Sequence, residues 1–93
     1  MLREIRAYAI YARDRGWIRP EQVGNHDVCV AITKNPLAAY LFSFDEDAIR
    51  TSAELTGVFE SRWNYDMFFE EEELRVVPVL FSYDDGFTVH EER

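Results

Sequence analysis

The spacing of the hydrophobic residues changes three times along this chain, and these changes limit the folds open to it. Apolar side chains recur every three or four positions in residues 2–15 and 46–62, which predicts two amphipathic helices. They recur at every second position from Asp27 and again from Leu74, which predicts strands. With 93 residues, the chain has room for a single domain, 1–93, that combines both kinds of element.

The first helix is predicted over residues 2–15. Its apolar positions fall at helical spacing: Leu2, Ile5, Ala9 and Ala12. Gly16 follows a basic last turn, an order that is typical of a helix end. Residues 17–23 are then predicted as a connector that contains one short helical turn beginning at Pro20.

A first hairpin is predicted from two alternating segments, Asp27–Thr33 and Leu37–Phe44. Lys34-Asn35-Pro36 between them has the residue types of a turn. A three-residue loop sets a register in which Val28 lies opposite Phe42. The second face of this hairpin is also apolar, with smaller side chains: Cys29, Ala31, Leu37, Ala39 and Leu41.

Residues 46–62 predict the second helix, and Ser43-Phe44-Asp45-Glu46 at its start has the spacing of a capping box. One stripe of this helix is predicted to pack on the sheet: Ile49, Ser52, Ala53, Thr56, Phe59 and Trp63. We expect Phe59 and Trp63 to be deeply buried. Gly57 leaves open a break inside the helix, because glycine there costs about 1 kcal/mol relative to alanine.

A second hairpin is predicted to join Leu74–Tyr83 to Phe87–Glu91 through Asp84-Asp85-Gly86. A two-residue loop and a three-residue loop are both compatible with this turn. We favour the three-residue loop, which pairs Tyr83 with Phe87, because it places aromatic and branched side chains on one face of the hairpin.

The order of these elements, α-β-β-α-β-β, predicts an α+β fold. We expect a two-layer sandwich, with two helices on one face of a four-stranded, mainly antiparallel sheet. Residues 64–73 are predicted as an irregular connection or a short helix. Pro78 cannot donate to a neighbouring strand, so its strand is predicted at a sheet edge or with a bulge. The helix-covered face is predicted to carry Val28, Val30, Tyr40, Phe42, Val77, Val79, Phe81, Phe87 and Val89.

The charge of the chain excludes several classes of function. Its net charge is −8, from 18 acidic and 10 basic residues, whereas direct binding to nucleic acid or to an anionic membrane needs cations. No apolar run approaches the roughly 18–20 residues of a membrane helix. Residues 3–6 are mostly charged where a signal peptide would be apolar. Because Cys29 is also the only cysteine, we predict a cytoplasmic protein.

No group of residues has the pattern of a catalytic or metal site. His26 and Cys29 are three positions apart, and residues at that separation in a strand point to opposite faces. Zinc usually takes four ligands, and the only other histidine is His90. The acidic runs lack the spacing of a calcium loop. We therefore predict no catalytic residue, no metal and no cofactor, and expect that the protein is not an enzyme.

Acidic residues are concentrated in the second part of the chain. Residues 1–34 hold six basic and four acidic groups, a net charge of +2, whereas residues 35–93 hold four basic and fourteen acidic groups, a net charge of −10. Several acids lie beside aromatic residues, and interfaces use aromatics for burial and charges for steering. The predicted partner-binding residues are Asp45, Glu46, Asp47, Asp66, Phe68, Phe69, Glu70, Glu71, Glu72, Glu73, Asp84 and Asp85.

These features predict a non-catalytic acidic binding protein that engages and occludes a basic protein partner. The partner would be a nuclease toxin or a nucleic-acid-binding effector, whose cationic groove the carboxylates fill in place of phosphates. The protein would then be an inhibitor of the immunity type or a phage-encoded mimic of nucleic acid. The alternative is a small structural or regulatory subunit that self-associates into a homodimer through the second apolar face of the first hairpin.

Overall fold

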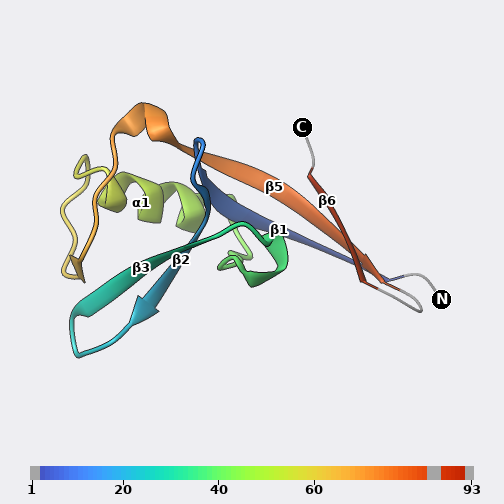
Figure 1. The fold of residues 1–93 in the computed structure, drawn as a ribbon, viewed down its shortest axis with the longest axis horizontal. Helices are drawn as coiled ribbons and strands as arrows, with labels where there is room; N and C mark the ends of the chain where they lie inside the picture. The colour runs from blue at the N-terminus through green and yellow to red at the C-terminus, as the bar shows by residue number, and fades with distance from the viewer. Residues whose placement is uncertain (1–2, 84–86, 92–93) are drawn as a thin grey trace.

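A long antiparallel pair of strands forms the centre of the fold. The two strands, β1 (Arg3–Ala12) and β5 (Leu74–Tyr83), pair along their whole length in one continuous register. The structure is a computed structural model that describes residues 3–83 and 87–91. Both strands run along the long axis of the molecule (Figure 1).

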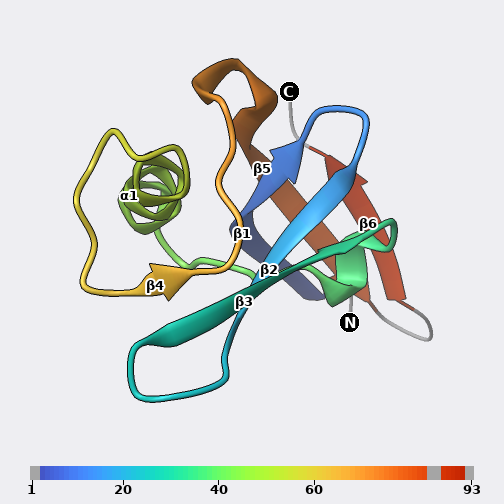
Figure 2. The same cartoon turned by 60° about the vertical axis from the view of Figure 1, so that its left-hand side comes forward.

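Four further strands flank this pair in one sheet. The remaining elements are β2 (Gly16–Gln22), β3 (Asp27–Thr33), the 3-10 turn η1 (Pro36–Ala38), the helix α1 (Asp45–Leu55), β4 (Asn64–Tyr65), the 3-10 turn η2 (Glu71–Glu73) and β6 (Phe87–Glu91). The strand order is β4-β3-β2-β1-β5-β6, and each neighbouring pair is antiparallel except β3 with β4. The β2–β3 hairpin turns away from β1 and β5, so that the sheet curves into a half-barrel with α1 on one side (Figure 2).

The predicted sandwich of two helices on a four-stranded sheet is therefore wrong, because the first predicted helix is the strand β1. Along β1, Ala7 and Ala9 pack into a cluster on one face of the sheet, and Tyr8 and Ile10 pack into a cluster on the other. An apolar residue at nearly every position hides the two-residue period of the strand. The alanines then fall by coincidence at helical spacing.

The turn between β1 and β2 needs two residues with positive φ. Asp14 has a φ of 61° and Gly16 a φ of 138°. A Cβ atom at Gly16 would lie 2.6 Å from the carbonyl oxygen of Thr33, so this position accepts only glycine. The residue that predicted a helix end thus begins β2 and lets β3 approach closely.

β2 occupies the residues that were predicted as a connector, and it pairs with β3 over six positions. The bounds of β3 confirm the predicted strand Asp27–Thr33. Pro20 is tolerated in β2 because of its orientation. The carbonyl of Ile18 accepts from the N–H of Tyr40, at 3.2 Å, so it points away from β3. Pro20, two positions further on, presents its nitrogen on the same side, where no ladder bond to β3 is lost.

Residues 39–42, which we call the wedge segment, lie where β1 and β2 diverge. β1 and β2 pair only at the two positions next to their turn. Beyond that point Phe42 exchanges two backbone hydrogen bonds of 2.8 Å with Tyr8 of β1, while the N–H of Tyr40 donates to Ile18 of β2. The wedge segment therefore satisfies backbone groups that the splayed strands no longer offer to each other.

The predicted strand Leu37–Phe44 is wrong, because the chain forms the turn η1 and then the wedge segment in its place. Pro36 begins η1, and the side chain of Asn35 caps it by accepting from the N–H of Leu37 at 3.1 Å. Ala39 is buried in the core. The pairing predicted between Val28 and Phe42 and the second apolar sheet face around Leu37, Ala39 and Leu41 do not exist, which removes the observation that suggested a homodimer.

α1 is shorter than the predicted helix over 46–62. It ends at Leu55, and Gly57, with a φ of 76°, turns the chain left-handed directly after it. The break that Gly57 left open is thus confirmed. At the other end Phe44 is the N-cap and makes no side-chain capping bond, so the predicted capping box is absent. Instead, the carboxylate of Asp45 accepts from the N–H of Glu46 at 2.8 Å.

The buried side of α1 is not the predicted one. Ala48 and Leu55 face the sheet and are both 0% exposed. Ile49 is 54% exposed and Phe59 is 46% exposed, while Trp63 is half-buried. The prediction that Phe59 and Trp63 are deeply buried is therefore wrong, because the helix stops before either residue and presents Ile49 to solvent.

The second hairpin matches its prediction. Tyr83 lies opposite Phe87 and Leu80 opposite His90, which is the register of a three-residue loop. The residues of that loop, Asp84-Asp85-Gly86, lie outside the described residues.

Pro78 does not place β5 at the edge, because β5 lies between β1 and β6. Pro78 is opposite Tyr8, whose backbone N–H and C=O bond to Phe42 on the other side of β1. The Tyr8–Pro78 pair thus carries no ladder hydrogen bond, and the nitrogen of Pro78 faces the β6 side. β6 ends at Glu91, opposite Val79. Among the described residues, none of β6 lies opposite Pro78, so proline removes no ladder hydrogen bond there.

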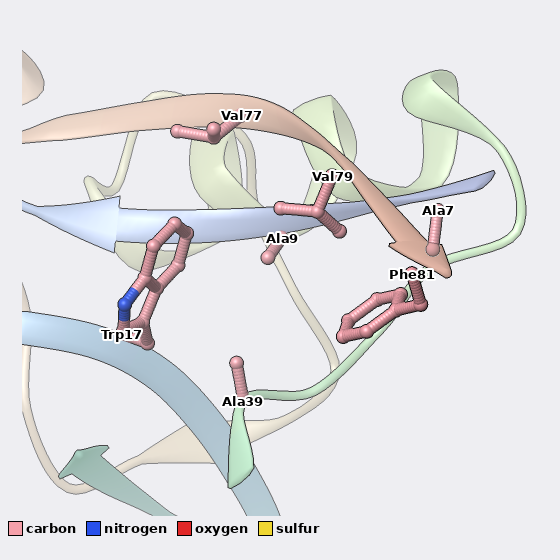
Figure 3. Packing of buried hydrophobic residues seen from close by; sticks show 7 residues of the cluster. All are labelled: Ala7, Ala9, Trp17, Ala39, Val77, Val79 and Phe81. Atoms are coloured by element: carbon pink, nitrogen blue, oxygen red, sulfur yellow. The ribbon is translucent and has the colours of Figure 1, made fainter. Parts of the chain in front are cut away.

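Two apolar clusters fill opposite faces of the sheet. The cluster inside the half-barrel consists of Ala7, Ala9, Trp17, Ala39, Val77, Val79 and Phe81 (Figure 3). The cluster under α1 consists of Ile10, Ala12, Ile18, Val30, Ala48, Leu55 and Phe69. Val77, Val79 and Phe81 were predicted to lie under helices, but they point to the opposite face, toward Trp17. The small side chains of Ala7 and Ala9 leave room for the large ring of Trp17.

Candidate interaction surface

The outer side of α1 combines exposed apolar side chains with neighbouring acids. Two shallow hollows on it share Ile49. The first is lined by Glu46, Asp47, Ile49, Arg50 and Phe59. The second is lined by Ile49, Ser52, Ala53, Thr56, Val58 and Glu71. We call these two hollows together the α1 face. Ile49, Val58 and Phe59 expose large apolar areas within it, which is the composition of an interaction surface.

Phe59 is held on the α1 face by the chain reversal after the helix. The N–H of Gly57 donates to Glu54 at 3.1 Å, and the N–H of Phe59 donates to Ala53 at 3.1 Å. These bonds fold residues 57–59 back along α1. The guanidinium of Arg50 then lies 4.6 Å from the centre of the Phe59 ring, an attractive cation–π distance. Phe59 is thus both exposed and positioned.

The acids of the first helical turn border one end of the α1 face. Asp45, Glu46 and Asp47 are all exposed. Negative charge is favourable at a helix N-terminus because the free N–H groups there carry partial positive charge. The same residues are therefore stabilising in the helix and available to a cationic partner, and Glu46 and Asp47 line the hollow next to Ile49.

The acidic run 70–73 borders the other end. It forms η2, which is closed by a reciprocal capping box between Glu70 and Glu73. The carboxylate of Glu73 accepts from the N–H of Glu70 at 3.1 Å and lies 3.9 Å from Arg15. Glu73 therefore supports the fold, whereas Glu70, Glu71 and Glu72 are exposed and Glu71 lines the second hollow.

The three predicted partner-binding residues before this run, Asp66, Phe68 and Phe69, differ in their contacts and in their exposure. The carboxylate of Asp66 accepts from the N–H of Val30 at 2.8 Å. Phe68 is 60% exposed and meets Tyr65 edge-on, with ring centres 6.4 Å apart. Phe69 is only 5% exposed, and its N–H donates to Leu55 at 2.9 Å. Phe69 is therefore a core residue and does not belong to the α1 face.

Asp84 and Asp85, which were also predicted to bind the partner, lie outside the described residues. The acids that the structure does bring together around Ile49 are Glu46, Asp47 and Glu71. Sequence reasoning missed the apolar centre of this surface, because Ile49 and Phe59 were assigned to the core. The change of conformation at Gly57 was the signal that separates Phe59 from the helix.

A second concave site lies between the β2–β3 hairpin, the wedge segment and α1. It has a volume of about 240 Å³ and is lined by Pro20, Gln22, Val28, Tyr40, Phe42, Thr51, Trp63 and Tyr65. Sequence reasoning assigned Tyr40 and Phe42 to a sheet face and Trp63 to the core. The wedge segment instead brings Tyr40 and Phe42 to the wall of one pocket, and the chain just before β4 brings Trp63 to the same wall. We call this site the aromatic pocket.

The described part of the chain holds no cluster of three or more His, Cys, Asp or Glu side chains that suits a metal ion. His26 lies beside Trp63, with ring centres 6.2 Å apart, and Cys29 lies beside Asp66. A hydrogen bond with Asp66, and then the negative charge of that carboxylate, raise the pKa of the Cys29 thiol above its usual value. The thiol is therefore less reactive than an ordinary one, because the thiolate is the nucleophile.

The chain was also compared with known proteins. No protein-family model, curated protein or solved structure matches it. Within residues 3–83 and 87–91, no helix combines the length and the apolar character that crossing a membrane requires.

Proposed function

We propose that this chain is a non-catalytic binding protein that engages a basic protein partner through the α1 face. The observation that carries the proposal is the position of Ile49, which is exposed and shared by two hollows with acids at either end. A partner of this chemistry is a nuclease toxin or a nucleic-acid-binding effector. Occupation of its Lys/Arg groove would block access of phosphates to that groove.

The two components of the α1 face have separate roles in this proposal. Burial of Ile49, Val58 and Phe59 would supply affinity at about 25 cal/mol per Å² of apolar area. The carboxylates of Glu46, Asp47 and Glu71 would accelerate association and orient the partner, because charges at the border of an interface act mainly on the encounter rate. The net charge of −8 adds a long-range attraction to any cationic partner.

The test is kinetic. A partner captured from the native host at low salt is identified, and its association rate is measured with wild type and with the triple variant Glu46→Gln/Asp47→Asn/Glu71→Gln. We expect a several-fold slower association at low salt, little change in dissociation, and a smaller difference at high salt, because the Debye length falls from about 10 Å at 0.1 M to 3 Å at 1 M.

A matched control removes the same amount of charge elsewhere. The triple variant Glu4→Gln/Asp14→Asn/Glu21→Gln changes three exposed acids on β1, its turn and β2. Asparagine accepts the left-handed backbone of Asp14. Equal slowing by both triple variants would show that only net charge matters, and unaltered association with the first variant would refute the α1 face as the binding surface.

A further inference from the structure

The aromatic pocket is a concave site that the α1 face does not use. Its walls come from segments far apart in the sequence: β2, β3, the wedge segment, α1 and residues 63–65. Its volume of about 240 Å³ is slightly below the roughly 300–1,000 Å³ of sites for drug-sized ligands. The pocket therefore suits a compact head group rather than an extended molecule.

Four aromatic side chains line this pocket. Tyr40 and Phe42 lie side by side on the wedge segment, with ring centres 4.8 Å apart and planes inclined by 59°. Trp63 and Tyr65 line it from the segment around β4. Since the planes of Tyr40 and Phe42 are inclined, the two rings form an angled wall rather than a flat stack. Aromatic ring faces carry negative electrostatic potential, and several of them around one space attract a cation.

The charges around the pocket favour a cation as well. The lining residues include no lysine, arginine or histidine. The hydroxyl of Tyr65 donates to the carboxylate of Glu54 at 3.4 Å, which places a negative charge next to the wall. Burial, with a smaller contribution from Glu54, raises the pKa of Tyr65, so its ring stays an uncharged phenol at neutral pH. The guanidinium of Arg62 lies 5.3 Å from the centre of the Trp63 ring, a cation–π distance. Arg62 does not line the pocket, and its positive charge partly offsets the negative charge of Glu54.

The pocket wall offers few hydrogen-bond acceptors, which disfavours cations that carry N–H donors. Thr51 and Gln22 are the non-aromatic polar residues that line the pocket, and the amide nitrogen of Gln22 already donates to the carbonyl of Gly24 at 2.8 Å. A primary ammonium carries three N–H donors that each need an acceptor when water is removed. A trimethylammonium group has no N–H donor and spreads its charge over methyl groups.

We propose that the aromatic pocket binds a trimethylammonium head group, held by the faces of Tyr40, Phe42, Trp63 and Tyr65. This goes beyond the proposed function and does not depend on it. The head group can belong to a small molecule such as choline or to a trimethyllysine side chain, and both present the same chemistry to the pocket.

The direct test compares choline with 3,3-dimethyl-1-butanol, which has the same shape and no charge. Binding is followed by isothermal titration calorimetry, which needs no reporter ring and therefore also serves Trp63→Leu. In proteins that keep Trp63, its indole NMR signal locates the site, while the buried Trp17 serves as an internal reference. We expect choline to bind about tenfold more tightly than the neutral analogue, which corresponds to a cation–π contribution of about 1.4 kcal/mol. Equal affinities, or no saturable change with choline, would overturn the proposal.

Two variants test the walls. Trp63→Leu and Tyr40→Leu each replace a ring by an apolar side chain, and each is expected to weaken choline binding several-fold or more. Tyr40 is 49% exposed, so its replacement leaves the fold intact even if Trp63→Leu destabilises it. Phe44→Leu is the matched control, because Phe44 is 61% exposed and does not line the pocket. Wild-type affinity in Tyr40→Leu and Trp63→Leu would refute the assignment.

Two further measurements identify the source of the head group and separate this site from the α1 face. A peptide with trimethyllysine that binds more tightly than choline, while its unmodified lysine counterpart binds weakly, would assign the ligand to a protein side chain; the reverse order would assign it to a small molecule. The variant Glu46→Gln/Asp47→Asn/Glu71→Gln should leave choline affinity within about twofold of wild type, and Trp63→Leu should leave association through the α1 face unchanged.

Discussion

The side chain of Asp66 extends the pairing of β3 with β4 by one hydrogen bond beyond the two paired positions of the backbone. β4 pairs with β3 at only two positions. The N–H of Asp66 donates to the carbonyl of Val28 at 3.1 Å, and the carboxylate of Asp66 then accepts from the N–H of Val30 at 2.8 Å. One residue therefore satisfies two backbone groups of β3, the carbonyl of Val28 and the N–H of Val30.

Replacement of Asp66 tests this contact. Asp66→Ala leaves the partly buried N–H of Val30 without a partner, and we expect the free energy of unfolding to fall by about 1–3 kcal/mol. Asp66→Asn keeps an acceptor oxygen at the same place and should lose clearly less. Urea denaturation of the three proteins provides the comparison. Equal stability of the alanine variant and wild type would show that water satisfies Val30 as well as the carboxylate does.

The same carboxylate governs the chemistry of Cys29. Because its hydrogen bond and charge raise the pKa of Cys29, the thiolate forms at a higher pH than that of an ordinary cysteine. In Asp66→Asn the rise of the alkylation rate with pH should shift to lower pH. Glu21, the weakest of the causes that raise this pKa, gives the control, since Glu21→Gln should shift the profile less. The rate of reaction with iodoacetamide between pH 7 and pH 10 measures both.

The orientation of α1 makes a third prediction. Leu55 is 0% exposed and Ile49 is 54% exposed. Leu55→Ala should reduce the free energy of unfolding by about 2–5 kcal/mol, as for other buried leucines. Ile49→Ala should change it by no more than about 0.5 kcal/mol. Thermal or urea unfolding of both variants is sufficient, and a larger loss for Ile49→Ala than for Leu55→Ala would reverse the assignment of the helix faces.

Two glycines with positive φ make a matched pair. In Gly57→Ala the added Cβ atom has no neighbour within 4 Å, so the only penalty is the left-handed backbone. This conformation lowers the free energy of unfolding by about 1–2 kcal/mol for a residue with a side chain. Gly16→Ala has an unfavourable φ and in addition places a Cβ atom 2.6 Å from the carbonyl oxygen of Thr33, so β3 must shift. We expect Gly16→Ala to lower the melting temperature more than Gly57→Ala does. A smaller effect at Gly16 would mean that the β1–β2 turn relaxes without disturbing β3.

The elements that the sequence predicts correctly are those whose residue types leave no other choice. Asp27–Thr33 is rich in β-branched residues, and Leu74–Tyr83 combines β-branched with aromatic residues; both residue types favour strands. The register of Tyr83 with Phe87 follows from the preference for aromatic and branched side chains on one face, which selects the three-residue loop over the two-residue loop. Arg3–Ala12 was mistaken for a helix because its alanines suit either conformation, and only the pairing with Leu74–Tyr83 makes it a strand.

For the α1 face, too, the sequence predicts the features that depend on residue type and misses those that depend on tertiary contacts. Exposure of Glu46, Asp47 and Glu71 was predictable, since carboxylates without a partner stay in water. The exposure of Ile49 was not, because it depends on which side of α1 meets the sheet, and that is decided by contacts of Ala48 and Leu55 with distant strands. The aromatic pocket was hidden for a similar reason: the wedge segment takes its path from the divergence of two strands, not from any local pattern.

The register of β1 with β5 also has a consequence for how fast the protein folds. This pairing joins Arg3 to Tyr83 and Ala12 to Leu74, so the longest strand contact links positions from opposite ends of the described chain. A large loop must close before any of these contacts forms, and folding rates fall as the sequence separation of contacts grows. We expect refolding on roughly the millisecond-to-second scale of all-β domains rather than that of helical bundles, with β1 exposed as an unpaired edge until β5 reaches it.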